Sequence, residues 1–222
     1  MWYSVILVIG TYLWAAIPTA YLVSRHIKGI DIRDYGSGNV GAANVMTHVG
    51  RWYGLLLGGF DCVGKGMLPM VIAGLFGMGN FVHLCIGVVA VTAHNWSPYL
   101  RFTGGRGAAT TVGVVLGAFM WQEAIILAIV MGLLGKIILR DTGLSAFVST
   151  LALPVLAFMF NRPDEIVYMS LGISVLLILK RITANWEPIT NEYSFVQVAK
   201  NRILFDRDVY ERIEWTNRRP KL

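Results

Sequence analysis

Two glycine-rich stretches hold the residues whose types and spacing are best suited to chemistry. The first runs from Gly36 to Asn44 and the second from Gly104 to Gly107, and each leads into a helical pattern. Glycine lets backbone N–H groups turn inward, and a helix amino terminus adds unpaired donors and a positive dipole end. Each stretch is therefore predicted to cradle an anion. Two such cradles facing one compartment indicate a substrate with phosphate groups.

Ionisable residues also occur inside apolar stretches, where they are costly and usually line an interior site. Asp61 and Lys65 are four residues apart, so they share one face of a helix and are expected to pair. This pair either contacts a substrate or fixes helix packing, and the sequence leaves both open. Pro69, which follows Lys65 and Gly66, predicts an irregular helix. His94 ends an apolar stretch and is expected to cap or pack, with catalysis as the rarer alternative.

Two further spacings imitate known motifs. Residues 36–41 match the dinucleotide fingerprint G-x-G-x-x-G, with Asp61 twenty residues beyond Gly41. That fingerprint needs a preceding strand and a soluble βαβ unit, so the nucleotide interpretation is not favoured. His26 and Asp31 have the H-x4-D spacing of acyl-CoA or acyl-carrier acyltransferases. His26 stands among basic residues at a membrane exit, where a basic anchor is the commoner role.

These residues must be positioned by membrane helices. The 222 residues are 55% hydrophobic and 14% charged, with a mean hydropathy of +0.59, whereas soluble domains carry about 25% charged residues. Helices of about 20 apolar residues span a bilayer, and shorter ones need tilt or re-entry. An all-α membrane protein with about seven transmembrane helices is therefore predicted. Its apolar segments are 2–23, 53–76, 81–96, 108–121, 124–138, 144–160 and 166–179.

Basic residues alternate between the connections of these segments, and such residues accumulate in loops that stay in the cytoplasm. The connections after the first, third, fifth and seventh segments are basic, while the intervening ones carry no net positive charge. This alternation predicts an external amino terminus, a cytoplasmic carboxyl terminus and both glycine-rich stretches on the cytoplasmic face. No basic residue precedes the first segment, so we expect it to be retained rather than cleaved as a signal peptide.

The chain is expected to divide into a membrane domain, residues 1–186, and a basic cytoplasmic tail, residues 187–222. The tail alternates apolar and charged residues and is expected to lie as an interfacial helix. Its acidic residues dilute the basic charge and argue against nucleic-acid binding; they are Asp206, Asp208, Glu211 and Glu214. Cys62 and Cys85 lie in apolar stretches, so neither a disulfide nor a metal site is expected. The oligomeric state is not indicated.

Taken in order, the motifs resemble the bacterial acyl-phosphate-dependent glycerol-3-phosphate acyltransferases, a family of small seven-helix membrane enzymes. The resemblance covers Gly10 to Asn185. The matching stretches are 17–18 with 21–23, 29–33, 36–42 with 44–45, 61, 65–66 with 69, 94–98 and 102–110. The motifs around the two glycine-rich stretches are specific together, and either alone would be weak.

The resemblance implies transfer of a fatty acyl group from acyl phosphate to the 1-hydroxyl of glycerol 3-phosphate, which gives lysophosphatidate and phosphate for phospholipid biosynthesis. It places the enzyme in the bacterial plasma (inner) membrane with its site facing the cytoplasm, and it calls for no cofactor or metal. Acyl phosphate is already activated, so catalysis can rest on alignment and charge stabilisation. A covalent acyl-enzyme at Ser37 stays open, although no neighbouring base is evident.

The resemblance and the residue chemistry together assign candidate roles. Arg106, where the family has lysine, offers a bidentate fork for phosphate oxygens. Ser37 and Asn39 are expected to hydrogen-bond the polar substrate, and Asn44 to hold the first loop. The candidate catalytic residues are Ser37, Arg106 and Asn185. The candidate substrate-binding residues are Gly36, Gly38, Asn39, Gly41, Asn44, Arg51, Lys65, His94, Arg101, Gly104, Gly105 and Gly107.

The sequence departs from the family at several positions. The family's first motif ends in Thr-Asn-x-x-Arg, whereas this chain has Ala43 and Thr47. We expect Arg51, one helical turn beyond Thr47, to supply the missing charge. The family's last helix ends with a histidine and an asparagine, yet no histidine follows His94, and Asn185 is the candidate asparagine.

Two alternatives belong to other classes of protein. The departures fit a weakly active or inactive relative that binds a phosphorylated lipid precursor, and buried Asp61 and Lys65 also suit the path of a small transporter. A transporter gives no reason for glycine-rich loops confined to one side, and the sequence has no visible repeat of interrupted helices. The acyltransferase is therefore the favoured interpretation.

Overall fold

The computed structural model describes residues 2–138, 140–186 and 194–217, and it is all-helical there apart from turns and one isolated bridge between Ser97 and Thr103. The predicted all-α class is confirmed. In the labels used below, η1, η3 and η5 are 3₁₀ helices and η2 and η4 are π-helices. The elements are α1 (Trp2–Ala15), α2 (Thr19–Lys28), η1 (Ile32–Asp34), α3 (Ala42–His48), α4 (Arg51–Phe60), η2 (Asp61–Met67), α5 (Leu68–Leu75), α6 (Asn80–Asn95), η3 (Pro98–Leu100), α7 (Ala108–Gly117), α8 (Trp121–Ile129), η4 (Val130–Ile138), α9 (Thr142–Met159), α10 (Asp164–Thr183), η5 (Ala184–Trp186), α11 (Phe195–Phe205) and α12 (Arg212–Thr216).

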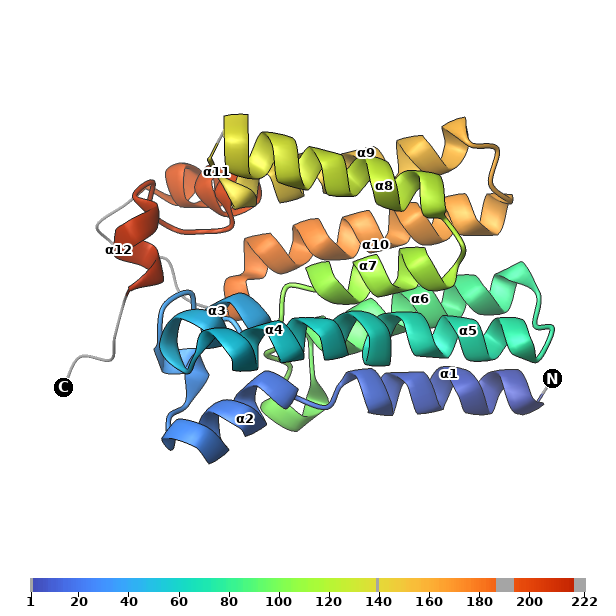
Figure 1. The fold of residues 1–222 in the computed structure, drawn as a ribbon, viewed down its shortest axis with the longest axis horizontal. Coiled ribbons are helices and arrows are strands. Elements are labelled where there is room, and N and C mark those ends of the chain that lie inside the picture. Colours follow the sequence, from blue (N-terminus) through green and yellow to red (C-terminus); the bar gives the residue numbers. More distant parts are fainter. Residues whose placement is uncertain (1, 139, 187–193, 218–222) are drawn as a thin grey trace.

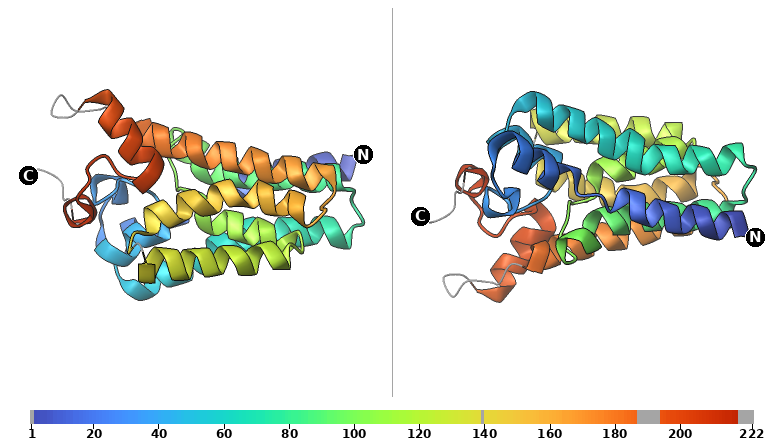
Figure 2. Two further views of the ribbon diagram at one scale, coloured as in Figure 1. Left: turned by 90° about the horizontal axis from the view of Figure 1, so that it is seen from above. Right: turned by 90° about the horizontal axis from the view of Figure 1, so that it is seen from below.

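The long helices run side by side along the longest axis of the molecule (Figure 1, Figure 2). Helix α6 packs against both α1 and α10, and α7 packs against η2. The main core lies between these helices and includes Met70, Ile86, Met169 and Ile173, all fully buried. Helix α1 begins at one end of the bundle, whereas α3, α11 and α12 lie at the other end (Figure 1).

Within the described residues, four helical stretches are long and apolar enough to cross a membrane: Trp2–Lys28, Arg51–Leu75, Thr142–Met159 and Asp164–Thr183. Three apolar helices are shorter, namely Asn80–Asn95, Ala108–Gly117 and Trp121–Leu133. Large apolar side chains cover the outside of the bundle, and Leu75 and Phe76 are 81% and 75% exposed. So much exposed apolar surface requires lipid around it. Seven crossings and the direction of the two termini remain predictions.

The first apolar segment is not one helix, so the prediction for residues 2–23 is wrong in this respect. Helix α1 ends at Ala15 and α2 begins after its N-cap, Pro18. Proline has no N–H to continue the helical ladder, and the carbonyl groups before it need other donors inside a membrane. The Nζ atom of Lys65 donates to the Ile17 carbonyl at 2.7 Å. The Lys65 side chain therefore links the break between α1 and α2 to η2.

The irregular helix predicted around Lys65 and Gly66 is confirmed, because the stretch 51–75 passes through the π-helix η2 before α5. The expected pairing is confirmed as well: Lys65 Nζ lies 2.9 Å from Asp61 Oδ1, and the two side chains are 2% and 3% exposed. Helix α7 packs closely against this irregular turn.

Gly113 in α7 has no room for a side chain where α7 meets η2. A Cβ there would overlap the Cys62 carbonyl oxygen and lie 2.8 Å from the Met67 nitrogen. Overpacking a buried contact costs about 1–3 kcal/mol. Gly113→Ala is therefore expected to destabilise the protein by about 2 kcal/mol, seen as a lower Tm in detergent. Gly59→Ala is the matched control because a Cβ on Gly59 meets no atom within 4 Å, and equal shifts in both variants would contradict the close packing.

Candidate functional site

The first glycine-rich stretch forms a compact loop between η1 and α3. Gly36 and Gly38 have φ angles of 54° and 65°, in the left-handed region that glycine adopts without strain. Asn44, in the first turn of α3, donates through Nδ2 to three preceding backbone carbonyls at 2.9 to 3.1 Å. These contacts confirm that Asn44 holds the loop. Ser37 Oγ accepts a hydrogen bond from the Asn39 N–H at 3.4 Å.

The second glycine-rich stretch lies against the end of α6. The Gly105 N–H donates to the His94 carbonyl at 3.0 Å, and a Cβ on Gly105 would overlap the His94 ring. His94 is buried, which fits the packing role expected of it, and the substrate-binding role assigned to it remains a prediction. Gly107, with a φ of 74°, is the N-cap of α7. The stretch therefore enters α7 directly from a turn that only small residues allow.

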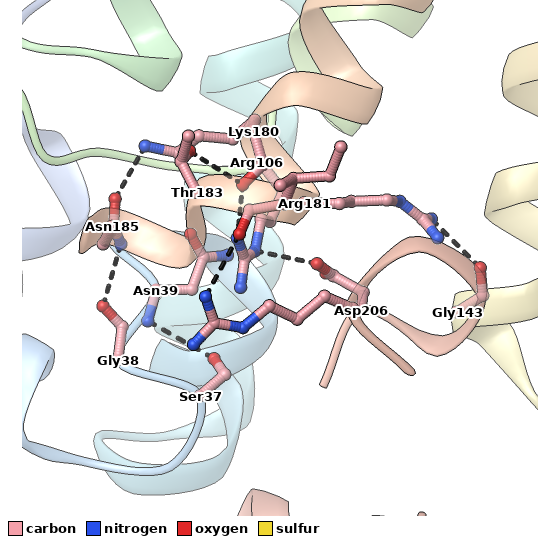
Figure 3. Close-up of polar contacts among 12 residues, drawn as sticks. Ser37, Gly38, Asn39, Arg106, Gly143, Lys180, Arg181, Thr183, Asn185 and Asp206 are labelled. Carbon is pink, nitrogen blue, oxygen red and sulfur yellow. Dashed lines mark hydrogen bonds and ion pairs between the residues drawn. The ribbon is translucent and has the colours of Figure 1, made fainter. Parts of the chain in front are cut away.

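Asn185 joins the two loops. The Val40 N–H donates to the Gly104 carbonyl at 3.3 Å, so the loops also touch each other directly. Asn185 Nδ2 donates to the Gly38 and Gly104 carbonyls at 3.1 and 3.2 Å, and its Oδ1 accepts from the Gly104 N–H at 3.0 Å (Figure 3). The structure therefore brings the two glycine-rich stretches together, while anion binding by them remains a prediction.

Lys180 belongs to this cluster, and the sequence did not single it out. Its side chain is fully buried, and Nζ donates to Asn185 Oδ1 at 2.6 Å and to the Asn95 carbonyl. Nζ also lies 5.2 Å from the centre of the Trp96 ring, within range of a cation–π interaction. At the end of an apolar segment, Lys180 looks like an ordinary interfacial anchor. The turn at Ala184, with a φ of 40°, brings Asn185 back to it, and sequence spacing does not reveal that turn.

Arg106 reaches the same cluster from the second loop. Its Nη1 donates to the Lys180 carbonyl at 2.9 Å, and its Nε forms an ion pair with Asp206 Oδ1 at 3.0 Å. Figure 3 shows Arg106 together with Asn39 and Asp206 in this cluster. Among the described residues, these contacts leave Nη2 of Arg106 without a partner, and the buried Asn39 Oδ1 also has no hydrogen bond. The cluster therefore offers free donors and a free acceptor.

Lys65 and His94 line a small pocket between the break after α1 and Gly104. The three protons of the Lys65 ammonium have three acceptors in the protein: the Ile17 carbonyl at 2.7 Å, Thr19 Oγ1 at 3.1 Å and Asp61 Oδ1 at 2.9 Å. A lysine has three donors and no more. Of the two roles left open for this pair, the fixing of helix packing accounts for the contacts, and the substrate-binding role assigned to Lys65 remains a prediction.

Arg51 and Arg101 have exposed side chains. Helix α3 ends at His48 and Arg51 begins the separate helix α4, so the expectation that Arg51 lies one helical turn beyond Thr47 is wrong. Arg101 follows η3 in a left-handed turn with a φ of 54°. The phosphate-binding roles assigned to both arginines remain predictions.

Asp31 is engaged by Arg33 rather than by His26. Arg33 Nη2 lies 2.6 Å from Asp31 Oδ2, while His26 is exposed. The hydrogen bonds from Arg33 hold the pKa of Asp31 below its ordinary value, and the same contact raises the pKa of Arg33. The H-x4-D spacing therefore does not produce a paired dyad. The described residues contain no group of three or more His, Cys, Asp or Glu that could hold a metal ion.

Gly36 has no room for a side chain in the first loop. A Cβ there would lie 2.5 Å from Asn44 Oδ1 and 2.6 Å from His48 Nε2, and the φ of 54° is strained for other residues. Gly36→Ala is therefore expected to reduce kcat/KM by about 10-fold or more, because a displacement of about 1 Å can cost 100-fold. Gly10→Ala, at an open position, should leave the rate unchanged. A fully active Gly36→Ala enzyme would show that this loop geometry is not needed.

The fold and this cluster define a class: integral membrane proteins of packed helices, with a polar cluster built from two glycine-rich loops at one end of the bundle. The chain belongs to the glycerol-3-phosphate acyltransferase family, whose model matches residues 5–191. The family and the enzyme class expected from the sequence motifs are thereby confirmed.

Similar proteins cover most of the chain. Glycerol-3-phosphate acyltransferase 5 of Dehalococcoides mccartyi is 36% identical over 222 residues, covering 96% of this chain and 93% of the relative. Glycerol-3-phosphate acyltransferase 2 of Moorella thermoacetica is 39% identical over 167 residues, covering 73% and 81%. The glycerol 3-phosphate form of PlsY (YgiH), an integral membrane glycerol 3-phosphate acyltransferase, matches with a TM-score of 0.74 and 32% identity over 80% of this chain and 88% of that one. Its lysophosphatidic acid form has a TM-score of 0.71, with 31% identity over 80% and 87% of the two chains.

Proposed function

We propose that this chain transfers a fatty acyl group from acyl phosphate to the 1-hydroxyl of glycerol 3-phosphate, giving lysophosphatidate and phosphate in phospholipid biosynthesis. The family membership and the named relatives support glycerol 3-phosphate as the acceptor. The choice of acyl phosphate as donor rests on the motifs of the two glycine-rich loops. The proposed site is the cluster that Asn185 joins.

The observation that carries the proposal is the set of unpartnered groups between the loops. Arg106 Nη2 offers donors, and the buried Asn39 Oδ1 offers an acceptor, with no partner for either among the described residues. Buried polar groups are normally paired, so the unpaired Asn39 Oδ1 points to a ligand. Glycerol 3-phosphate complements both groups, because its phosphate oxygens accept hydrogen bonds and its hydroxyl groups donate them.

Transfer then needs alignment more than a new nucleophile. The 1-hydroxyl oxygen of glycerol 3-phosphate attacks the acyl carbonyl carbon, and the bond from that carbon to the phosphate oxygen breaks. The hydroxyl proton leaves with the phosphate, so the products are the acyl ester and hydrogen phosphate. Arg106 stabilises the negative charge that develops, and Ser37 and Asn39 orient the polar reactants.

The membrane arrangement is part of the proposal. Seven crossings, with the amino terminus outside and the carboxyl terminus in the cytoplasm, would place both loops at the cytoplasmic face of the bacterial inner membrane. The alternating charge of the connections supports this orientation. The acyl chain would lie among the apolar helices, where membrane lipid surrounds the protein.

The test is a transfer assay on the purified full chain in lipid mesophase, with synthetic acyl phosphate and labelled glycerol 3-phosphate. The expected result is lysophosphatidate and free phosphate in equal amounts, both dependent on glycerol 3-phosphate. A single-turnover burst of phosphate without glycerol 3-phosphate would support the acyl-enzyme alternative at Ser37. Binding of glycerol 3-phosphate without turnover would instead identify an inactive relative, and flux across vesicles without acyl transfer would identify a transporter.

A further inference from the structure

The tail beyond the family match reaches the proposed site. The match to the family model ends at residue 191. Asp206 lies beyond it, in the tail, and its Oδ1 is 3.0 Å from Arg106 Nε. Figure 3 shows Asp206 in the same cluster as Arg106, Lys180 and Asn185. A carboxylate from outside the matched region is thus in direct contact with the guanidinium proposed to hold phosphate.

Several contacts fix the tail in this position. Arg181 Nη1 donates to the Ile203 carbonyl at 2.7 Å, and His48 Nε2 donates to the Thr216 carbonyl at 3.0 Å beside the first loop. Arg207 forms an ion pair with Asp141 at 2.7 Å. Asp206 therefore belongs to a segment that is attached to α10, to α3 and to the start of α9, which keeps its backbone beside Arg106.

The Arg207 ion pair should persist at ordinary pH. Burial tends to raise the pKa of Asp141, but hydrogen bonds from Arg207 and from two backbone N–H groups outweigh it and hold this pKa below the ordinary value of 3.8. A carboxyl group with a lowered folded pKa contributes stability above its unfolded pKa and loses it only as the pH falls through the folded value. The tail attachment is therefore present throughout the neutral range.

The contacts of Arg106 favour a role in which Asp206 orients the guanidinium, rather than one in which it competes with substrate phosphate for the guanidinium. The Lys180 carbonyl accepts a hydrogen bond from Nη1, and Asp206 Oδ1 lies 3.0 Å from Nε as an ion pair without a hydrogen bond, so one directional contact and one charge contact act on the guanidinium. The Nη2 donors stay available, as described above. An arginine that is fixed before substrate arrives loses less side-chain entropy on binding phosphate.

We propose that Asp206 is a positioning residue that aims the Arg106 guanidinium at a phosphate group of the substrate. This inference rests on the proposed function and adds the tail to the active site. It does not make Asp206 a catalytic residue, because the carboxylate acts through Arg106.

The test compares Asp206→Asn with the wild-type full chain in the acyl transfer assay. We expect kcat/KM for glycerol 3-phosphate to fall about 10-fold, inhibition by inorganic phosphate to weaken, and Asp206→Glu to recover part of the rate. In an Arg106→Gln background, Asp206→Asn should cause no further loss, because the two residues act as one unit.

The matched control is Asp208→Asn, which removes a tail carboxylate 2.6 Å from Arg202 instead of Arg106. It should keep more than half of the wild-type rate. Equal losses in the two variants would overturn the proposal, because they would indicate tail attachment alone. A gain in affinity for phosphate in Asp206→Asn would overturn it too, because the carboxylate would then be a competitor. If the wild-type chain transfers no acyl group, the proposed function fails; if it does and Asp206→Asn matches it, only this inference fails.

Discussion

Replacing Asn185 with alanine is expected to lower kcat/KM for acyl transfer by about 100-fold or more. The side chain makes three hydrogen bonds to the two glycine-rich loops and one to the buried Lys180. Removing it leaves a buried ammonium and two loop carbonyls without these partners, and the loops lose the link that sets their spacing. The measurement is steady-state transfer with both substrates varied.

The isosteric variant Asn185→Asp should be nearly as inactive, because a carboxylate cannot donate to the Gly38 and Gly104 carbonyls. Asn201→Ala is the matched control. Asn201 donates to the Asp208 carbonyl within the tail at 3.1 Å rather than to either loop, so its loss should cost less than about 3-fold in rate. An Asn185→Ala enzyme with more than a tenth of the wild-type rate would contradict the linking role.

The second large effect is expected at Arg106. Arg106→Gln removes the positive charge and the bidentate donors, and it should lower kcat/KM by about 1000-fold, near the upper range for removal of one charge-stabilising donor. Arg106→Lys keeps the charge but changes the donor geometry, so it should recover part of that loss. The loss should appear in kcat as well as in KM, because the guanidinium acts on the charge that develops during transfer.

Arg25→Gln is the matched control for this experiment. Arg25 is exposed on α2 and donates to the nearby Gly29 carbonyl at 2.9 Å, so its replacement should leave transfer close to the wild-type rate. If Arg106→Gln is as active as Arg25→Gln, phosphate is bound elsewhere. The site assignment is then wrong even though the chain transfers acyl groups.

Those parts of the site that depend on local chemistry could be predicted from the sequence. Asn44 follows the glycine-rich stretch within the first turn of a helix, so its amide is close to the loop carbonyls whatever the rest of the fold does. The Asp61–Lys65 pair follows from a spacing of four residues in one helix. Hydropathy gives the all-helical membrane class because a long apolar stretch has few alternatives to a helix in lipid.

The parts that depend on backbone turns and distant segments could not be predicted. The sequence suggests that the helix containing Thr47 continues to Arg51. In the structure α3 ends at His48 and Arg51 begins α4, so Arg51 does not lie one helical turn beyond Thr47. Hydropathy does not reveal the break at Pro18 in the first apolar segment, because the donors that make it tolerable come from residues far along the chain, such as Lys65. In the sequence, Asp206 only dilutes the charge of a basic tail, since nothing local indicates that it meets Arg106.

An experimental structure of the full chain with glycerol 3-phosphate would show directly whether the two glycine-rich loops form one phosphate-binding site. We expect the phosphate to lie within hydrogen-bond distance of Arg106 Nη2 and a glycerol hydroxyl to donate to Asn39 Oδ1. A glycerol 3-phosphate molecule bound away from both residues, with Asn185 still joining the loops, would contradict this expectation.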